Sequence, residues 1–258
     1  MSTTTTAPAP VRAAVTVRTA LASEWIKIRS VRASFGSLIA VVGVALGLSA
    51  LIFPLIGQAE AENGEDILFG IFYPMNFVQI AAISFGATAA SSEFLNGALR
   101  NSLAAVPNRT LLYGAKTAVA AAVSLVAGLA AGFGIFLTAN AFLGKYALGL
   151  GDPGALRACV GAGVYLALMA LFSLGLTFLL RSAVAVLSIM IPFILIVSFV
   201  VGGVSEGAAM WLPDHAGQQI LHQNPTGPLG PWTGLGVMAL WTAAALAAGW
   251  WSLRRRDA

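Results

Sequence analysis

The chain has 258 residues, of which 58% are hydrophobic and 9% are charged, and its formal net charge is +4. Soluble domains carry about 25% charged residues, so a water-soluble fold could not hide this much apolar surface. A single cysteine, Cys159, excludes an internal disulfide framework and argues against a metal cluster.

The N-terminus begins with MSTTTTAPAP, a polar stretch that is interrupted by proline. No short apolar core with a small-residue cleavage site follows it, so we expect residues 1–10 to be a disordered tail rather than a signal peptide.

Residues 11–32 predict a helix that lies in the cytoplasmic membrane interface. Apolar residues recur there at helical spacing among basic residues, and Trp25 would lie at the membrane boundary. The segment also contains Glu24, Lys27 and Arg29. Glu24 falls near the apolar stripe and therefore needs a partner, either Lys27 one turn later or a basic group in another segment.

Six charge-free runs are long enough to cross a hydrocarbon core of about 30 Å. They are 33–59, 67–92, 117–144, 158–180, 182–205 and 232–253. Six spans place both termini on one side, and with cytoplasmic termini the outer loops contain only Lys145 and Arg157 of the 14 Lys and Arg residues. This partition favours a cytoplasmic location of both termini, including the basic tail 254–258.

Several residues within the spans have special roles. Pro54, Pro74 and Pro192 are expected to kink their helices. Gly43 with Gly47, and Gly128 with Gly132, have the spacing that lets helices approach closely, either within this chain or in a dimer. Three intramembrane amides form interhelical hydrogen bonds or line a path, and they are Asn76, Gln79 and Asn140.

The stretch SSEFLNGALRNSLAAVPNR, residues 91–109, places charges between two apolar runs. Ser91 or Ser92 is a good N-cap for a helix with Glu93 in its first turn. An apolar stripe then follows the helix, formed by Leu95, Leu99, Leu103 and Val106. Pro107 ends the helix. We therefore predict a short amphipathic helix over 92–106 on the cytoplasmic side.

Residues 205–231 are too polar and too rich in proline and glycine for a seventh span. Apolar residues such as Trp211 and Ile220 indicate an external re-entrant hairpin that turns near Pro213 to Gly217. The alternative is a surface loop with interfacial anchors. A metal site at His215, His222 and Asp214 lacks a further firm ligand.

No span carries Asp, Glu, Lys or Arg in its middle, where ion-coupled transporters usually place them. The GAKT sequence at 114–117 lacks the glycines and the preceding strand of a phosphate loop. We therefore expect no enzymatic activity, cofactor or nucleotide site in this chain.

Residues 91–109 resemble the coupling helix of permease subunits of type-2 exporters among the ATP-binding-cassette (ABC) transporters, especially the actinobacterial type. The matching residues are Ser92, Glu93, Phe94, Gly97, Arg100, Pro107 and Arg109. The SEWIKIRSVRASF sequence at 23–35 resembles the interfacial helix of the same group. The spacing from Glu93 to Gly97 is shorter than in importer permeases, which favours the exporter class.

The resemblance implies an all-α polytopic permease with six transmembrane helices over 33–253, a coupling helix and an external hairpin, in a bacterial plasma membrane. It implies two protein partners, a cytoplasmic ABC ATPase that binds ATP and Mg²⁺ and a second permease copy or paralogue. Membrane lipid would surround the protein, and no nucleic acid would bind to it. The ATPase would contact the coupling residues Glu93, Phe94, Gly97, Arg100 and Arg109. The alternatives are a non-transporting membrane scaffold or immunity protein and a secondary transporter.

Overall fold

The computed structural model of the protein describes residues 16–63, 66–95, 97–225 and 227–255, and within these ranges it contains helices and no β-strand. The predicted all-α class is therefore confirmed for this part of the chain. The predicted tail 1–10, the first residues of the interfacial segment (11–15) and residues 256–258 lie outside the described residues.

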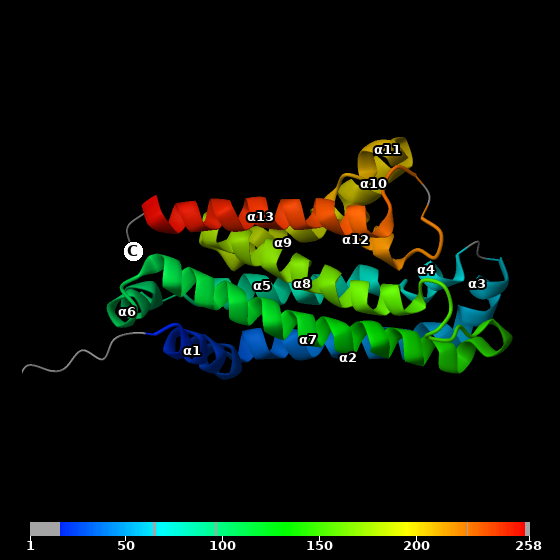
Figure 1. Cartoon of the computed structure of the whole chain (residues 1–258), viewed down its shortest axis with the longest axis horizontal. Helices are drawn as coiled ribbons and strands as arrows, with labels where there is room; N and C mark the ends of the chain where they lie inside the picture. Colours follow the sequence, from blue (N-terminus) through cyan, green and yellow to red (C-terminus); the bar gives the residue numbers. More distant parts are fainter. Residues whose placement is uncertain (1–15, 64–65, 96, 226, 256–258) are drawn as a thin grey trace, which may run out of the picture.

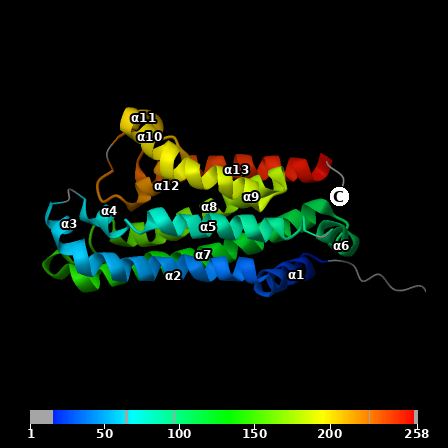
Figure 2. The same ribbon diagram turned by 180° about the vertical axis from the view of Figure 1, so that it is seen from behind.

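Long helices lie side by side and form an elongated bundle (Figures 1 and 2). The bundle helices are α2 (Arg32–Ile52), α5 (Met75–Ser91), α7 (Arg109–Leu143), α8 (Ala155–Leu180), α9 (Ala183–Pro192) and α13 (Pro231–Arg255). The shorter helices are α1 (Val17–Ser30), α3 (Gln58–Asn63), α4 (Ile67–Ile71), α6 (Ala98–Ala105), α10 (Ser198–Val204), α11 (Glu206–Ala209) and α12 (Pro213–Gln218). Single turns of other helix types are η1 (Phe53–Gly57), η2 (Gly144–Tyr146), η3 (Phe193–Val197) and η4 (Gln219–Leu221).

Five helical segments within the described residues are long and apolar enough to cross a membrane, which indicates a membrane-embedded protein. They are Arg32–Asn63, Arg109–Tyr146, Ala155–Leu180, Ala183–Val204 and Pro231–Arg255. The predicted span 67–92 is not one continuous helix, because α4 ends at Ile71 and α5 begins at Met75. The 17 residues of α5 rise about 25 Å, somewhat less than a full hydrocarbon core.

All three prolines predicted to kink the spans lie where helical geometry changes. Pro54 is in the π-helical turn η1, Pro192 directly precedes the π-helical turn η3, and Pro74 lies between α4 and α5. Proline lacks an N–H group, and its ring crowds the carbonyl one turn earlier, so the regular hydrogen-bond ladder is interrupted at these positions.

Small residues bring α8 close to its neighbours. A Cβ atom added to Gly86 of α5 would lie 1.9 Å from the Ala170 carbonyl oxygen of α8, and one added to Gly128 of α7 would lie 2.8 Å from the Gly163 carbonyl oxygen. Gly43 of α2, in contrast, has open space at this position. The Gly128–Gly132 pair therefore packs inside the chain, whereas Gly43 faces outward.

The two ends of the bundle differ in composition. Figure 1 places α1, α6 and the end of α13 at one end, here called the α6 end, and α3 and α4 at the other, here called the α3 end. Three helices with basic residues meet at the α6 end, since Lys27 is on α1, Arg100 is on α6 and Arg254 is in the last turn of α13. Lys145 and Arg157 flank the connection from α7 to α8, which lies at the α3 end.

The segment before α13 is helical but does not turn where the sequence suggested. Pro213 to Gln218 form helix α12, so the predicted turn at Pro213 to Gly217 is wrong. Proline at the first helical position favours this start, because its fixed φ suits the first turn and its missing N–H would have no helical partner there. Ile220 is fully buried and would meet a Cβ added to Gly161 of α8 at 2.1 Å.

The loop that leads from this segment to α13 is fixed at the α3 end. The Asp66 carboxylate accepts a hydrogen bond from the Gln223 backbone N–H at 3.0 Å and lies 3.1 Å from His222 Nδ1. Burial raises the pKa of Asp66, but the hydrogen bonds from His222 and from backbone N–H groups outweigh this effect and lower it below its ordinary value. His222 thus pairs with Asp66, whereas Asp214 accepts a hydrogen bond from Ser198 Oγ.

Candidate functional site

The candidate site is built at the α6 end from α1, the α5–α6 connection and α7. Helix α1 begins at an N-cap, Thr16, which forms a reciprocal capping box with Thr19. One face of α1 is buried, and it carries Ala20, Glu24 and Ile28 at intervals of four residues. A carboxylate thereby enters an otherwise apolar helix contact.

The helix predicted over 92–106 begins later in the structure, at Ala98. Ser92 does not begin a new helix, because α5 continues to Ser91 and the Ser92 hydroxyl donates back to the Ala89 carbonyl at 2.9 Å. A turn follows, and Gly97 adopts a left-handed conformation with a φ of 73° before α6 begins. The predicted helix 92–106 is therefore a turn followed by an eight-residue helix.

Four charged side chains meet at this point, and we call them the ion cluster: Glu24, Lys27, Glu93 and Lys116. Lys116 Nζ lies 2.6 Å from Glu24 Oε2 and 3.0 Å from Glu93 Oε1. Lys27 Nζ lies 2.8 Å from Glu24 Oε1 and 2.7 Å from Glu93 Oε1. Each lysine thus contacts both glutamates, and the cluster has no net charge.

Further polar contacts complete the ion cluster. Ser102 Oγ of α6 donates to Glu93 Oε2 at 2.7 Å and accepts from Lys27 Nζ at 3.0 Å. Glu24, Glu93 and Lys116 are 1–2% exposed, whereas the Lys27 side chain is 33% exposed. Charges this deeply buried are stable only when they are paired, so the three segments hold one another in place.

The partners within the ion cluster determine its protonation. Burial raises the pKa of Glu93, but the charge of Lys116 and the hydrogen bonds from Lys27 and Ser102 outweigh burial and lower it below its ordinary value of 4.5. Burial lowers the pKa of Lys27, but Glu24 and Glu93 outweigh burial and raise it above 10.5. Glu93 and Lys27 therefore remain ionised at neutral pH, as a structural connection between their segments requires.

The predicted coupling residues divide into two groups. Glu93 is buried in the ion cluster, Phe94 packs edge-to-face on Phe178 of α8 at 5.5 Å, and Arg109 donates to the Leu253 carbonyl of α13 at 2.6 Å. Gly97 and Arg100 are exposed. The outer surface of this segment therefore belongs to the turn at Gly97 and to α6.

The predicted leucine stripe is correct in part. Leu99 is 5% exposed and Leu103 packs against the core, so both hold α6 against the bundle. Val106 is also buried, but Leu95 is 61% exposed. Leu95 leaves the stripe because it lies in the turn before α6 and not in the helix.

The predicted residues of the interfacial helix also separate by face. Glu24 and Lys27 join the ion cluster, so Glu24 has both of the partners that the sequence allowed, one within its own helix and one in another segment. Trp25 is 43% exposed, and the Arg29 guanidinium lies 5.7 Å from the centre of its ring.

Two of the three amides predicted to lie within the membrane connect helices. Gln79 of α5 accepts a hydrogen bond from the Tyr165 hydroxyl of α8, and Asn76 accepts one from Gln218 of α12 at 3.2 Å. Asn140 instead bonds within its own helix and accepts from the Leu148 backbone N–H at 2.6 Å. The first two therefore form the predicted interhelical hydrogen bonds.

Lys116 belongs to the ion cluster and Ser102 bonds to it, but neither is among the predicted site residues. The sequence offered one signal for Lys116, which is a lone lysine at the start of the apolar run 117–144, because an ionisable group at such a position needs a partner. Ser102 offered no signal, since a serine in a polar segment is ordinary. Among the described residues, no group of three or more His, Cys, Asp or Glu side chains could hold a metal ion.

No protein-family model matches the chain, and no curated protein matches it.

Proposed function

We propose that the chain is the transmembrane permease subunit of an ATP-driven exporter of the ABC type. A separate cytoplasmic ATPase would supply the energy, and α6 with the turn at Gly97 would be its docking surface. A second permease copy or paralogue would complete the transport path.

One observation carries this proposal: the ion cluster connects the exposed segment around α6 to a long apolar helix. Glu93 and Ser102 lie on either side of the exposed turn at Gly97. Glu93 pairs with Lys27 of α1 and with Lys116 of α7, and Ser102 accepts a hydrogen bond from Lys27. A force applied to α6 would therefore move α1 and α7 together, because separating them leaves buried charges unpaired. This is the property that a coupling element requires.

The proposal includes a six-span topology with both termini in the cytoplasm of a bacterial cell. Helices α4 and α5 would together form the predicted span 67–92, interrupted at Pro74, because neighbouring helices can satisfy backbone groups at such a break. The concentration of lysine and arginine at the α6 end supports the orientation. A reporter that is active only after export should remain silent when fused after Ala258.

The residue chosen to test docking is Arg100. Glu93→Lys would leave three lysines with one glutamate in the ion cluster, so lost activity would not separate coupling from folding. Arg100 is exposed on α6. Arg254→Glu is the matched control, because it reverses an exposed arginine at the same end of the molecule but on α13.

The experiment purifies the full chain with its associated proteins and measures ATP hydrolysis in reconstituted vesicles. We expect an ABC ATPase to co-purify, and we expect Arg100→Glu to reduce its stimulation at least tenfold, since like charges opposed across an interface cost several kcal/mol. Arg254→Glu should have little effect. Normal stimulation in Arg100→Glu would contradict docking at α6, and a chain that functions without an ATPase would support the scaffold or immunity alternative.

A further inference from the structure

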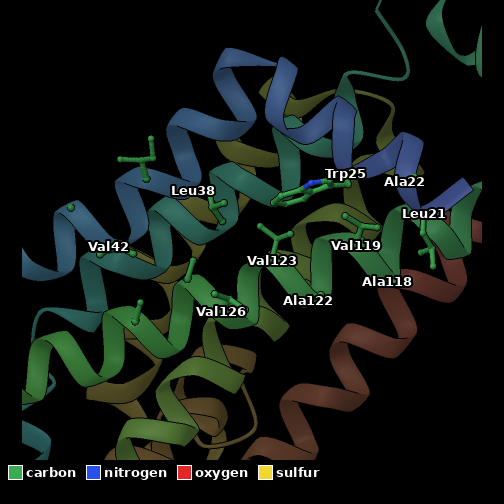
Figure 3. Close-up of a pocket in the computed structure, with 14 residues that line it drawn as sticks. Leu21, Ala22, Trp25, Leu38, Val42, Ala118, Val119, Ala122, Val123 and Val126 are labelled. Carbon is green, nitrogen blue, oxygen red and sulfur yellow. The ribbon is translucent and has the colours of Figure 1, made fainter. Parts of the chain in front are cut away.

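An apolar groove of about 1160 Å³ runs between α1, α2 and α7. In Figure 3, Leu21, Ala22 and Trp25 of α1 lie at one end of it, while Val42 of α2 and Val126 of α7 lie further along. Its volume is slightly above the range of about 300–1,000 Å³ for pockets that hold drug-sized ligands. The groove therefore has room for a long flexible hydrocarbon.

The length of the groove matches one membrane leaflet. On α7 its lining extends from Ala118 to Ala130, which corresponds to a rise of about 18 Å. A hydrocarbon core is about 30 Å thick, so the groove reaches approximately from one surface to the middle of the bilayer. It begins at α1, whose exposed tryptophan is typical of a membrane interface.

Two cations frame the surface end of the groove. Arg18 lies one turn before Ala22, and Arg29 lies one turn after Trp25, so both are on the face of α1 that lines the groove. Both arginines are exposed. Within the described residues neither Arg18 nor Arg29 has an ion-pair partner, and the Arg29 guanidinium lies over the Trp25 ring, so both guanidinium groups are available to an anion.

We propose that this groove binds one anionic phospholipid. An acyl chain lies along α2 and α7, and the phosphate lies at the mouth of the groove between Arg18 and Arg29. The proposal requires only that the chain is embedded in a membrane, so it can fail or succeed independently of the ATPase coupling proposed above.

The shape and charge of the groove favour a lipid over a helix from a second copy. Helix α1 stands at the surface end, so an occupant of the apolar part must finish there. A transmembrane helix is about 10 Å wide and would continue past the membrane surface, where it would meet α1 and its arginines. A phospholipid ends at this level with a phosphate, which is the group that arginine binds well.

The test is native mass spectrometry of the purified full chain in detergent, titrated with phosphatidylglycerol or with phosphatidylcholine of the same acyl chains. We expect one tight site that prefers phosphatidylglycerol. Arg18→Gln and Arg29→Gln should each reduce the ratio of the two affinities about fivefold, as follows from about 1 kcal/mol per basic residue at an anionic surface. Val126→Trp should weaken both lipids equally, because Val126 is 68% exposed and a larger side chain there fills the groove.

Arg254→Gln/Arg255→Gln is the matched control. These two exposed arginines also lie over tryptophan rings at the α6 end, at 4.8 and 4.4 Å from Trp250 and Trp251. An equal loss of preference in this control would reveal diffuse attraction and overturn the proposal, as would an unchanged preference in Arg18→Gln/Arg29→Gln. Efficient disulfide dimerisation of Val126→Cys in a Cys159→Ser background would instead identify a second copy as the occupant.

Discussion

Removing Lys116 tests whether the ion cluster holds the α6 end together. Lys116→Met deletes the ion pairs with Glu24 at 2.6 Å and with Glu93 at 3.0 Å, and it leaves two buried carboxylates that share Lys27. The cluster then has a net charge of −1. Breaking a buried ion pair on one side typically costs about 3–5 kcal/mol, and because Lys27 is partly exposed we expect a loss of about 3 kcal/mol.

A second substitution separates lost packing from unpaired charge. Glu24→Gln in the Lys116→Met background restores neutrality, since Glu93 then pairs with Lys27 and Ser102. We expect the double variant to be more stable than the sum of the two single effects by about 1–3 kcal/mol, which is typical for residues in one charged network.

The free energy of unfolding would be measured by titrating the protein from mild detergent into a denaturing detergent, with helix content as the signal. Lys145→Met is the control, because Lys145 is exposed at the α3 end and should change stability by less than about 0.5 kcal/mol. Additive effects of Lys116→Met and Glu24→Gln would refute the reasoning, since independent sites add and members of one cluster do not.

Three further predictions concern packing, pH and access. Gly86→Ala should unfold the protein or strongly destabilise it, because its Cβ would lie 1.9 Å from the Ala170 carbonyl oxygen, whereas Gly43→Ala, with open space, should be tolerated in the same unfolding assay. Because the pKa of Glu93 is lowered in the folded state, its contribution to stability is present above pH 4.5 and is lost as the pH falls through the folded value, and Glu93→Gln should remove this acid-dependent loss from an unfolding series. In a Cys159→Ser background, a membrane-impermeant thiol reagent should label Asp214→Cys slowly and Asn63→Cys rapidly, because Asp214 is 4% exposed and Asn63 is exposed, and equal rates would contradict the burial of α12.

The sequence predicted those features that depend on local composition. Long apolar runs predicted all five helical segments of the described residues that could cross a membrane. The prolines at 54, 74 and 192 marked positions where helical geometry changes. The break at Pro74 was expected as a kink in one helix and is a complete interruption between α4 and α5. Proline marks a weak point in a helix, but neighbouring packing decides how far the chain departs from helical geometry.

The ion cluster was predictable only in part because its contacts connect distant parts of the chain. Lys27 bonds Glu93 and Ser102 across 66 and 75 residues of sequence. The pattern of charges showed that Glu24 needed a partner but did not show which segments fold back on one another. Glu93 was therefore predicted to face an ATPase, although its carboxylate is buried and only its neighbours on α6 are exposed.

The burial of the ion cluster also explains why the chain places charges between apolar runs. Removing a charged side chain from water costs several kcal/mol, so neither Lys116 nor Glu24 would be stable in an apolar contact alone. Each charge is compensated by residues on other segments, and α1, the α5–α6 connection and α7 can therefore bury them only together. A movement of the α5–α6 connection would consequently separate Glu93 from Lys116 of α7 and from Lys27 of α1. An ordinary loop between two helices has no such buried ion pairs.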